Sequence, residues 1–99
     1  MFEINGEVWK IKRVPASHPK LRGINGYTIG SCDDVTKTIY ISKNITSPHL
    51  LWKVLCHEIT HAAMFSYNIE MTDEEHELVA DLFATYGQEI LNLTNRFLP

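Results

Sequence analysis

Two histidines and a glutamate in the middle of the chain have the types and spacing of a hydrolytic metal site. His57, Glu58 and His61 form the pattern His-Glu-x-x-His inside an apolar run. On an α-helix, residues four apart lie on one face about 6 Å apart, so both imidazoles can bind one zinc ion. Glu58 can then reach a water on that metal, whose pKa zinc lowers toward about 7, and take its proton. The pattern therefore predicts zinc-assisted hydrolysis of peptide bonds.

The same five letters would also fit a surface helix with solvated side chains, so the surrounding segment matters. Ser47 and Pro48 have the residue types of a helix start, and the helix expected over about residues 48–66 is apolar on nearly every side. A helix of that composition is expected to be buried. Unpaired polar groups are costly in a buried helix, and one metal ion would satisfy the two histidines and the glutamate together.

A second helix is expected over about residues 73–92. Thr72 and Glu75 have the spacing of a capping box, and apolar residues recur after them at helical intervals. The link between the two helices is short, so they are expected to pack against each other in antiparallel directions. Because a catalytic zinc site needs three protein ligands and one open position, the early residues of this second helix are expected to supply the third ligand.

Three side chains of the second helix are candidates for that ligand. Glu77 and Asp81 are four residues apart and share a face with Leu78 and Leu82, so this face is expected to point inward. A carboxylate there would need a partner. Glu77 ranks first as the ligand, His76 second and Asp81 third. Asp81 fits better as an acceptor for the N–H of a ligand imidazole, which would fix the tautomer of that ligand.

The first half of the chain is expected to form strands. Asn5-Gly6 is a favoured two-residue turn, so residues 2–14 are expected to form a hairpin, and residues 27–42 a second one around two adjacent aspartates. Pro15 to Gly26 contains two prolines and two glycines and is interpreted as a loop. Together with the two helices, these strands predict an α+β fold with a small antiparallel or mixed sheet.

Composition places the chain in the class of small globular proteins. With 99 residues and 44% hydrophobic content it is expected to form a single domain, residues 1–99. Cys32 and Cys56 do not make a disulfide framework, although Cys32 could in principle bind zinc as a thiolate. We find no pattern of a signal peptide and no apolar stretch that could span a bilayer. The sequence therefore predicts a soluble, cytoplasmic protein with no membrane partner.

Charge is distributed unevenly between the two halves of the chain. The net charge is −3, yet residues 1–53 hold eight Lys or Arg against four acids, whereas residues 54–99 hold one Arg against eight acids. A basic half can indicate an acidic partner. Here the basic residues are scattered, with no run beyond Lys12-Arg13 and no interleaved aromatics. We interpret them as a solvated face and expect no nucleic-acid partner.

Two stretches together resemble a known pattern. Residues 57–61, HEITH, followed by residues 77–84, ELVADLFA, are similar to the gluzincin arrangement of HExxH and a later ExxxD. The second stretch is most similar to small peptidases of the ImmA/IrrE kind, in which it reads roughly E-x-x-A-N/D-x-F-A. Some of those peptidases come from phages, and the short stand-alone minigluzincins are similar in size. The resemblance covers about residues 27–87.

The resemblance carries expectations for particular residues. It implies that His57, His61 and Glu77 bind zinc. It implies that Glu58 is the general base and that Asp81 supports a ligand histidine.

The resemblance also implies a fold and a substrate. The fold would be a minimal zincin domain, in which the strand over about residues 37–42 lies beside the cleft. That strand would offer its edge to an extended peptide. The substrate would be a specific intracellular or phage regulatory protein, because ImmA/IrrE-like relatives act on such regulators.

One part of a peptidase is not evident in the sequence. Peptide hydrolysis needs a group that stabilises the oxyanion. His76 and Tyr86 are the leading candidates for that role or for substrate contact, with Tyr67 and His49 behind them, and none stands at a diagnostic spacing. The alternative interpretation is therefore a catalytically weak or inactive zincin-like module for binding or regulation, with a structural zinc.

Overall fold

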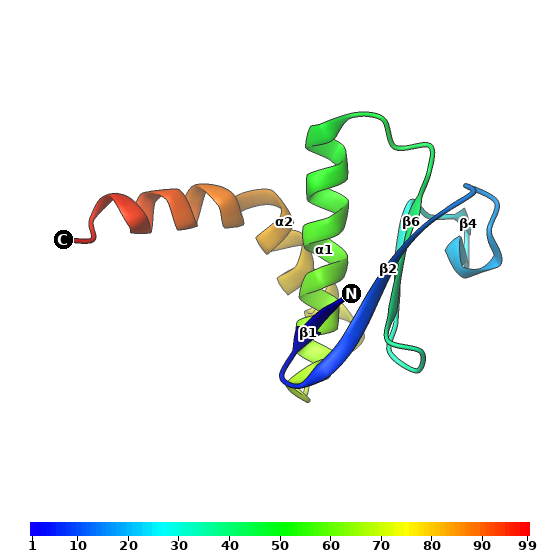
Figure 1. The fold of residues 1–99 in the computed structure, drawn as a ribbon, viewed down its shortest axis with the longest axis horizontal. Coiled ribbons are helices and arrows are strands. Elements are labelled where there is room, and N and C mark those ends of the chain that lie inside the picture. The colour runs from blue at the N-terminus through cyan, green and yellow to red at the C-terminus, as the bar shows by residue number, and fades with distance from the viewer.

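The computed structural model describes residues 1–99 and has a mixed sheet, a helix packed on that sheet and a second helix packed on the first (Figure 1). The four strands of the sheet, in spatial order, are β1 (Phe2–Ile4), β2 (Glu7–Val14), β6 (Thr38–Ser42) and β5 (Gly30–Asp33). The helices are α1 (Pro48–Ser66), which packs on β5 and β6, and α2 (Asp73–Arg96), which packs on α1. The predicted α+β class is confirmed.

Both predicted hairpins are present in the sheet. β1 and β2 pair antiparallel around Asn5 and Gly6, which have φ values of 50° and 79°. Two consecutive positive φ angles are the requirement of the hairpin turn that the Asn-Gly pair predicts. β5 and β6 also pair antiparallel, whereas β2 and β6 are parallel, so the sheet is mixed.

The expectation that the strand over residues 37–42 offers its edge is wrong. β6 is the inner strand, because β2 pairs with one of its edges and β5 with the other. All five of its residues are buried. An inner strand has no free backbone groups for a further strand, so the free edge on this side of the sheet belongs to β5.

The segment between β2 and β5 is more ordered than the predicted loop. It contains a short 3-10 turn, η1 (Pro19–Leu21), and a two-stranded hairpin made of β3 (Arg22–Gly23) and β4 (Gly26–Tyr27). Leu21 is fully buried, and the ring of His18 stacks on Tyr40. Tertiary contacts therefore order a segment whose glycine and proline content indicates only turns.

The core lies between the sheet and α1. Its buried side chains come from β2, β6 and α1 and include Trp9, Ile39, Ile41, Val54 and Ala62. The indole N–H of Trp9 donates a 2.7 Å hydrogen bond to the hydroxyl of the buried Ser66, at the last turn of α1. This bond ties the end of α1 to β2.

Local signals set the helix boundaries. The side chain of Ser47 accepts from the N–H of Leu50 at the start of α1, and Asn68, at φ 52°, lies just after its end. Thr72 and Glu75 form the expected capping box of α2. The bounds of α1 agree with the prediction, whereas α2 continues past residue 92 to Arg96.

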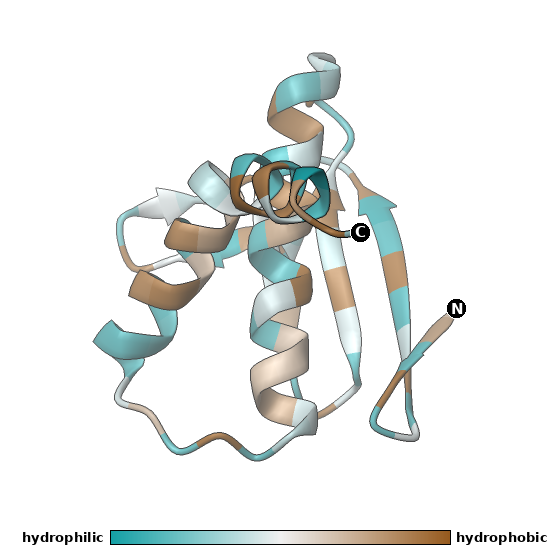
Figure 2. Ribbon diagram, turned by 90° about the vertical axis from the view of Figure 1, so that its left-hand side faces the viewer, coloured by the Kyte–Doolittle hydropathy of each residue, from teal (hydrophilic) through white to brown (hydrophobic).

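Two expectations about helix faces are wrong. The face of α2 that carries Leu78 and Leu82 points outward, since these side chains are 65% and 47% exposed. Small residues, Ala80, Ala84 and Gly87, are the buried ones of this helix. α1 is likewise only partly buried, and hydrophobic bands recur along both helices (Figure 2). In so small a chain, the two helices and the sheet cannot bury every apolar side chain.

The last turns of α2 project away from the sheet and end at the C-terminus (Figure 1). Neither α1 nor α2 has the length and apolar character needed to span a bilayer.

Replacement of Ser66 by Ala is expected to lower the free energy of unfolding by about 1–3 kcal/mol, because it leaves the buried N–H of Trp9 without an acceptor. Urea denaturation of the wild type and the variant measures this difference. Ser17→Ala is the matched control, since Ser17 is exposed. Equal stability of the Ser66 variant and the wild type would contradict the proposed tie between α1 and β2.

Candidate metal centre

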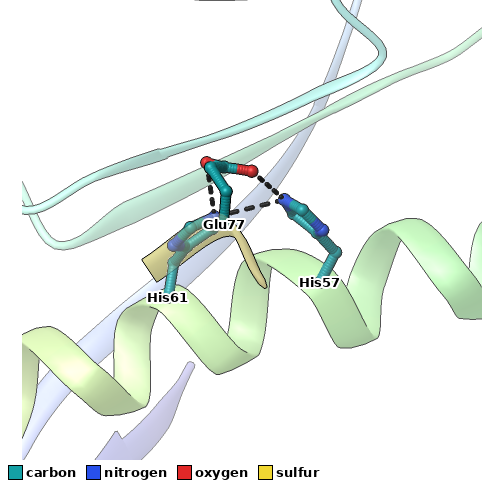
Figure 3. A group of neighbouring side chains, drawn as sticks. All are labelled: His57, His61 and Glu77. Carbon is teal, nitrogen blue, oxygen red and sulfur yellow. Dashed lines mark hydrogen bonds and ion pairs between the residues drawn. The ribbon is translucent and has the colours of Figure 1, made fainter. Parts of the chain in front are cut away.

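Three side chains from the two helices converge on one point (Figure 3). His57 and His61 come from α1, and their Nε2 atoms lie 3.1 Å apart. The carboxylate oxygens of Glu77, from α2, lie 3.2 Å from Nε2 of His57 and 3.0 Å from Nε2 of His61. Ligands at about 2.0–2.1 Å from a tetrahedral zinc lie about 3.3 Å from one another. The three donors therefore form a triangle close to one face of such a site.

Asp81, the hydrogen-bond partner of His57, makes the point where the three side chains converge electron-rich. Nδ1 of His57 lies 3.0 Å from a carboxylate oxygen of Asp81, which can only accept when ionised. We therefore assign the proton of His57 to Nδ1, which leaves a lone pair on Nε2. That lone pair faces a second imidazole nitrogen and the carboxylate of Glu77. A cation with nitrogen and oxygen ligands fits this donor set, and zinc is such a cation.

His61 is the most enclosed of the three donors. Burial lowers its pKa, and the nearby His57 and His76 lower it further against the opposing charge of Glu77. The neutral form is the form that can donate a lone pair to a metal. Its Nδ1 lies 2.7 Å from Nδ1 of His76, which ranked second as the third ligand and lies outside the group formed by His57, His61 and Glu77.

Glu58 lies on the buried side of α1, within the same cavity. It is 6% exposed, and burial, together with the charge of Glu77, raises the pKa of its carboxyl to about 7. Gly30 of β5 lies directly against it, because a Cβ placed on Gly30 would be 2.9 Å from a carboxylate oxygen of Glu58. A carboxyl with a pKa near neutrality can both accept and return a proton.

The cavity around these residues runs between α1, α2 and the edge strand β5. Its volume is about 790 Å³. Besides the site residues, its walls include Gly30 and Cys32 of β5 and Lys53, which precedes His57 by one helical turn. Burial and the charge of Glu58 raise the pKa of the Cys32 thiol to about 12, so this thiol is protonated at neutral pH.

The structure separates the other predicted candidates. His76 lines the cavity, whereas Tyr86 is exposed and lies outside it. Tyr67 lies on a different, apolar groove, and His49 is exposed near the start of α1. Of the residues considered for oxyanion stabilisation or substrate contact, the structure brings only His76 to the site.

Sequence reasoning missed two residues that shape the site. Gly30 was not singled out, although a glycine inside a strand often marks a close approach of another group. Lys53 could have been found from helical spacing, because it stands four residues before His57 on the same face.

The sequence profile of the IrrE N-terminal-like domain matches residues 3–91. The chain belongs to this zinc metallopeptidase family. The match includes the first strands, where the sequence alone offered no motif. No curated protein and no solved structure matches the chain. Membership of the family, together with the His-His-Glu group, supports a zinc-dependent peptidase-like function with protein substrates.

Replacement of Gly30 by Ala is expected to push the side chains of Glu58 and Val54 away. The added Cβ would lie 2.7 Å from a methyl of Val54, and overpacking of this kind costs about 1–3 kcal/mol of unfolding free energy. Urea denaturation measures the loss. In a variant that also carries Val54→Ala the methyl is gone, so the two changes together should cost less than the sum of the single changes. Additive costs would contradict this contact.

Proposed function

We propose that the protein is a zinc-dependent endopeptidase. In this proposal His57, His61 and Glu77 hold the metal and Glu58 is the general base. The observation that carries the proposal is the convergence of three lone-pair donors beside a buried carboxyl whose pKa is near neutrality. Family membership supports the same chemistry.

The chain's own residues have distinct tasks in this reaction. A zinc ion held by the three donors would acidify a water and polarise the scissile carbonyl. Glu58 takes the proton from the attacking water and passes it to the leaving amine. Asp81 accepts from Nδ1 of His57 and keeps Nε2 of that ring directed at the site. Gly30 leaves room for the Glu58 carboxyl, because a Cβ at this position would lie 2.9 Å from one of its oxygens.

We further propose that the substrate binds as an extended segment along β5. This strand has one edge paired with β6 and the other edge free, and it lines the cavity that contains Glu58. Addition of a strand to a free edge is a common mode of peptide recognition. The proposed substrate class is a specific regulatory protein, as expected from the resemblance to ImmA/IrrE-like peptidases.

A second candidate function is a zinc-binding module without catalysis. One observation favours it. His76 is the single candidate for oxyanion stabilisation that reaches the cavity, and its Nδ1 is already engaged with His61. The oxyanion would then depend on the metal alone.

The test compares the wild type with Glu58→Gln in zinc content and in cleavage of a fluorogenic peptide library. The variant is expected to keep about one zinc per chain, because it retains all three proposed ligands. Its cleavage rate is expected to fall by about 10²- to 10⁴-fold, the usual contribution of a general base. Glu74→Gln is the matched control, since Glu74 is an exposed acid on α2.

Each outcome separates the two candidate functions. Cleavage by zinc-loaded Glu58→Gln at the wild-type rate would remove Glu58 from its proposed role. A wild type that holds one zinc and cleaves nothing in the library would favour the non-catalytic module.

A further inference from the structure

We propose that His76 is a positioning residue, whose Nδ1 accepts a hydrogen bond from Nδ1–H of His61 and thereby directs Nε2 of His61 at the metal point. The inference rests on the proposed metal site and adds to it a residue that orients the ring of the second histidine, His61. It assigns to His76 neither metal binding nor oxyanion stabilisation.

The geometry of the two rings is that of an in-plane hydrogen bond. Their Nδ1 atoms lie 2.7 Å apart, their planes differ by 8°, and their centroids lie 5.0 Å apart. The centroid separation exceeds the N–N distance by about the combined radii of two imidazole rings. The rings of His61 and His76 therefore meet edge to edge in one plane, with each Nδ1 aimed at the other. This alignment is the one that an N–H···N hydrogen bond prefers.

The positions of the protons on the two rings set the direction of this hydrogen bond. Nε2 of His61 faces His57 and Glu77, so it must present its lone pair if a metal is to bind there. A neutral imidazole with a free Nε2 carries its proton on Nδ1. The Nδ1 of His76 is then the acceptor, and the proton of the His76 ring lies on its Nε2. The tautomer of His76 thus fixes the tautomer of His61.

The surroundings of His76 hold its ring in position. Phe65 packs against it, with ring centroids 4.8 Å apart. Its backbone N–H bonds to the carbonyl of Thr72, in the first, capped turn of α2. His76 directly precedes Glu77, so one turn of α2 supplies a ligand and orients another. Docking of this turn on α1 would therefore be coupled to metal binding.

The two histidine ligands have chemically different supports. Asp81 offers a carboxylate to His57, whereas His76 offers a neutral nitrogen to His61. Partners of metal-bound histidines are usually carboxylates, backbone carbonyls or water, and their loss typically weakens metal binding by 10–100-fold. The short, in-plane contact indicates that His76 fills this place for His61.

The test measures zinc affinity of the full chain by competition with a chelator, for the wild type and for variants at His76. His76→Leu removes the acceptor and is expected to bind zinc about 10–100-fold more weakly. His76→Asn places an amide oxygen near the position of Nδ1 and should recover most of that loss. His49→Asn is the matched control, because His49 is an exposed histidine on α1.

A second measurement uses the wild type alone, so it does not depend on whether a variant folds. In the zinc-loaded protein with ¹⁵N-labelled histidines, we expect a proton on Nδ1 of His61. We also expect a scalar coupling across the hydrogen bond to Nδ1 of His76. A merely structural role of His76 would produce neither the coupling nor the recovery by Asn.

The outcomes distinguish this inference from the proposed function. A wild type that binds no zinc would overturn the metal site and the role of His76 with it. A wild type that binds zinc, with His76→Leu binding it equally well, would overturn the role of His76 alone. A proton found on Nδ1 of His76 in the zinc-loaded protein would do the same.

Discussion

The packing of α2 across α1 is the constraint on which the site depends. It brings the carboxylate of Glu77 to two imidazole nitrogens, at 3.0 and 3.2 Å, and the tautomer that Asp81 requires directs a lone pair to the same point. Electron-rich atoms at such distances repel one another unless a proton or a metal cation lies between them. Contacts elsewhere also hold the two helices together. Buried alanines at positions 80 and 84 let α2 approach α1 closely.

The remaining elements hold α1 in position. The bond from Trp9 to Ser66 attaches its last turn to the sheet, and the cap at Ser47 sets its first turn. β5 lies along the other wall of the cavity, where Gly30 leaves room for the carboxyl of Glu58. The burial that raises the pKa of Glu58 is thus a consequence of how closely an edge strand passes the helix. The contact between β5 and α1 therefore both holds the fold together and sets the protonation of Glu58.

Much of this arrangement could be predicted because its signals are local. The spacing of His57 and His61 defines one face of a helix, and caps at Ser47 and Thr72 define where the helices begin. The short link between the helices limits the third ligand to the early residues of α2, whereas the first rank of Glu77 rested on an inward face with Leu78 and Leu82 that is in fact exposed. The family resemblance was confirmed, and the match extends to the first strands.

Other features depend on tertiary packing and could not be predicted. The sequence of β6 fits an inner or an outer strand equally well, and only its pairing with both β2 and β5 decides between them. Leu78 points outward because the small residues of α2 are the ones buried on this helix, and the sequence does not show which face of α2 packs against α1. The contact of His76 with His61 depends on the crossing of two helices, which spacing along one helix does not define.

The most direct test of the central claim is X-ray absorption at the zinc edge of the purified, zinc-loaded protein. We predict one zinc with two imidazole nitrogens at about 2.0–2.1 Å, one carboxylate oxygen and one water oxygen. We also predict the loss of the carboxylate contribution in Glu77→Ala. A sulfur ligand at about 2.3 Å, or a shell without imidazole, would contradict the site built from His57, His61 and Glu77.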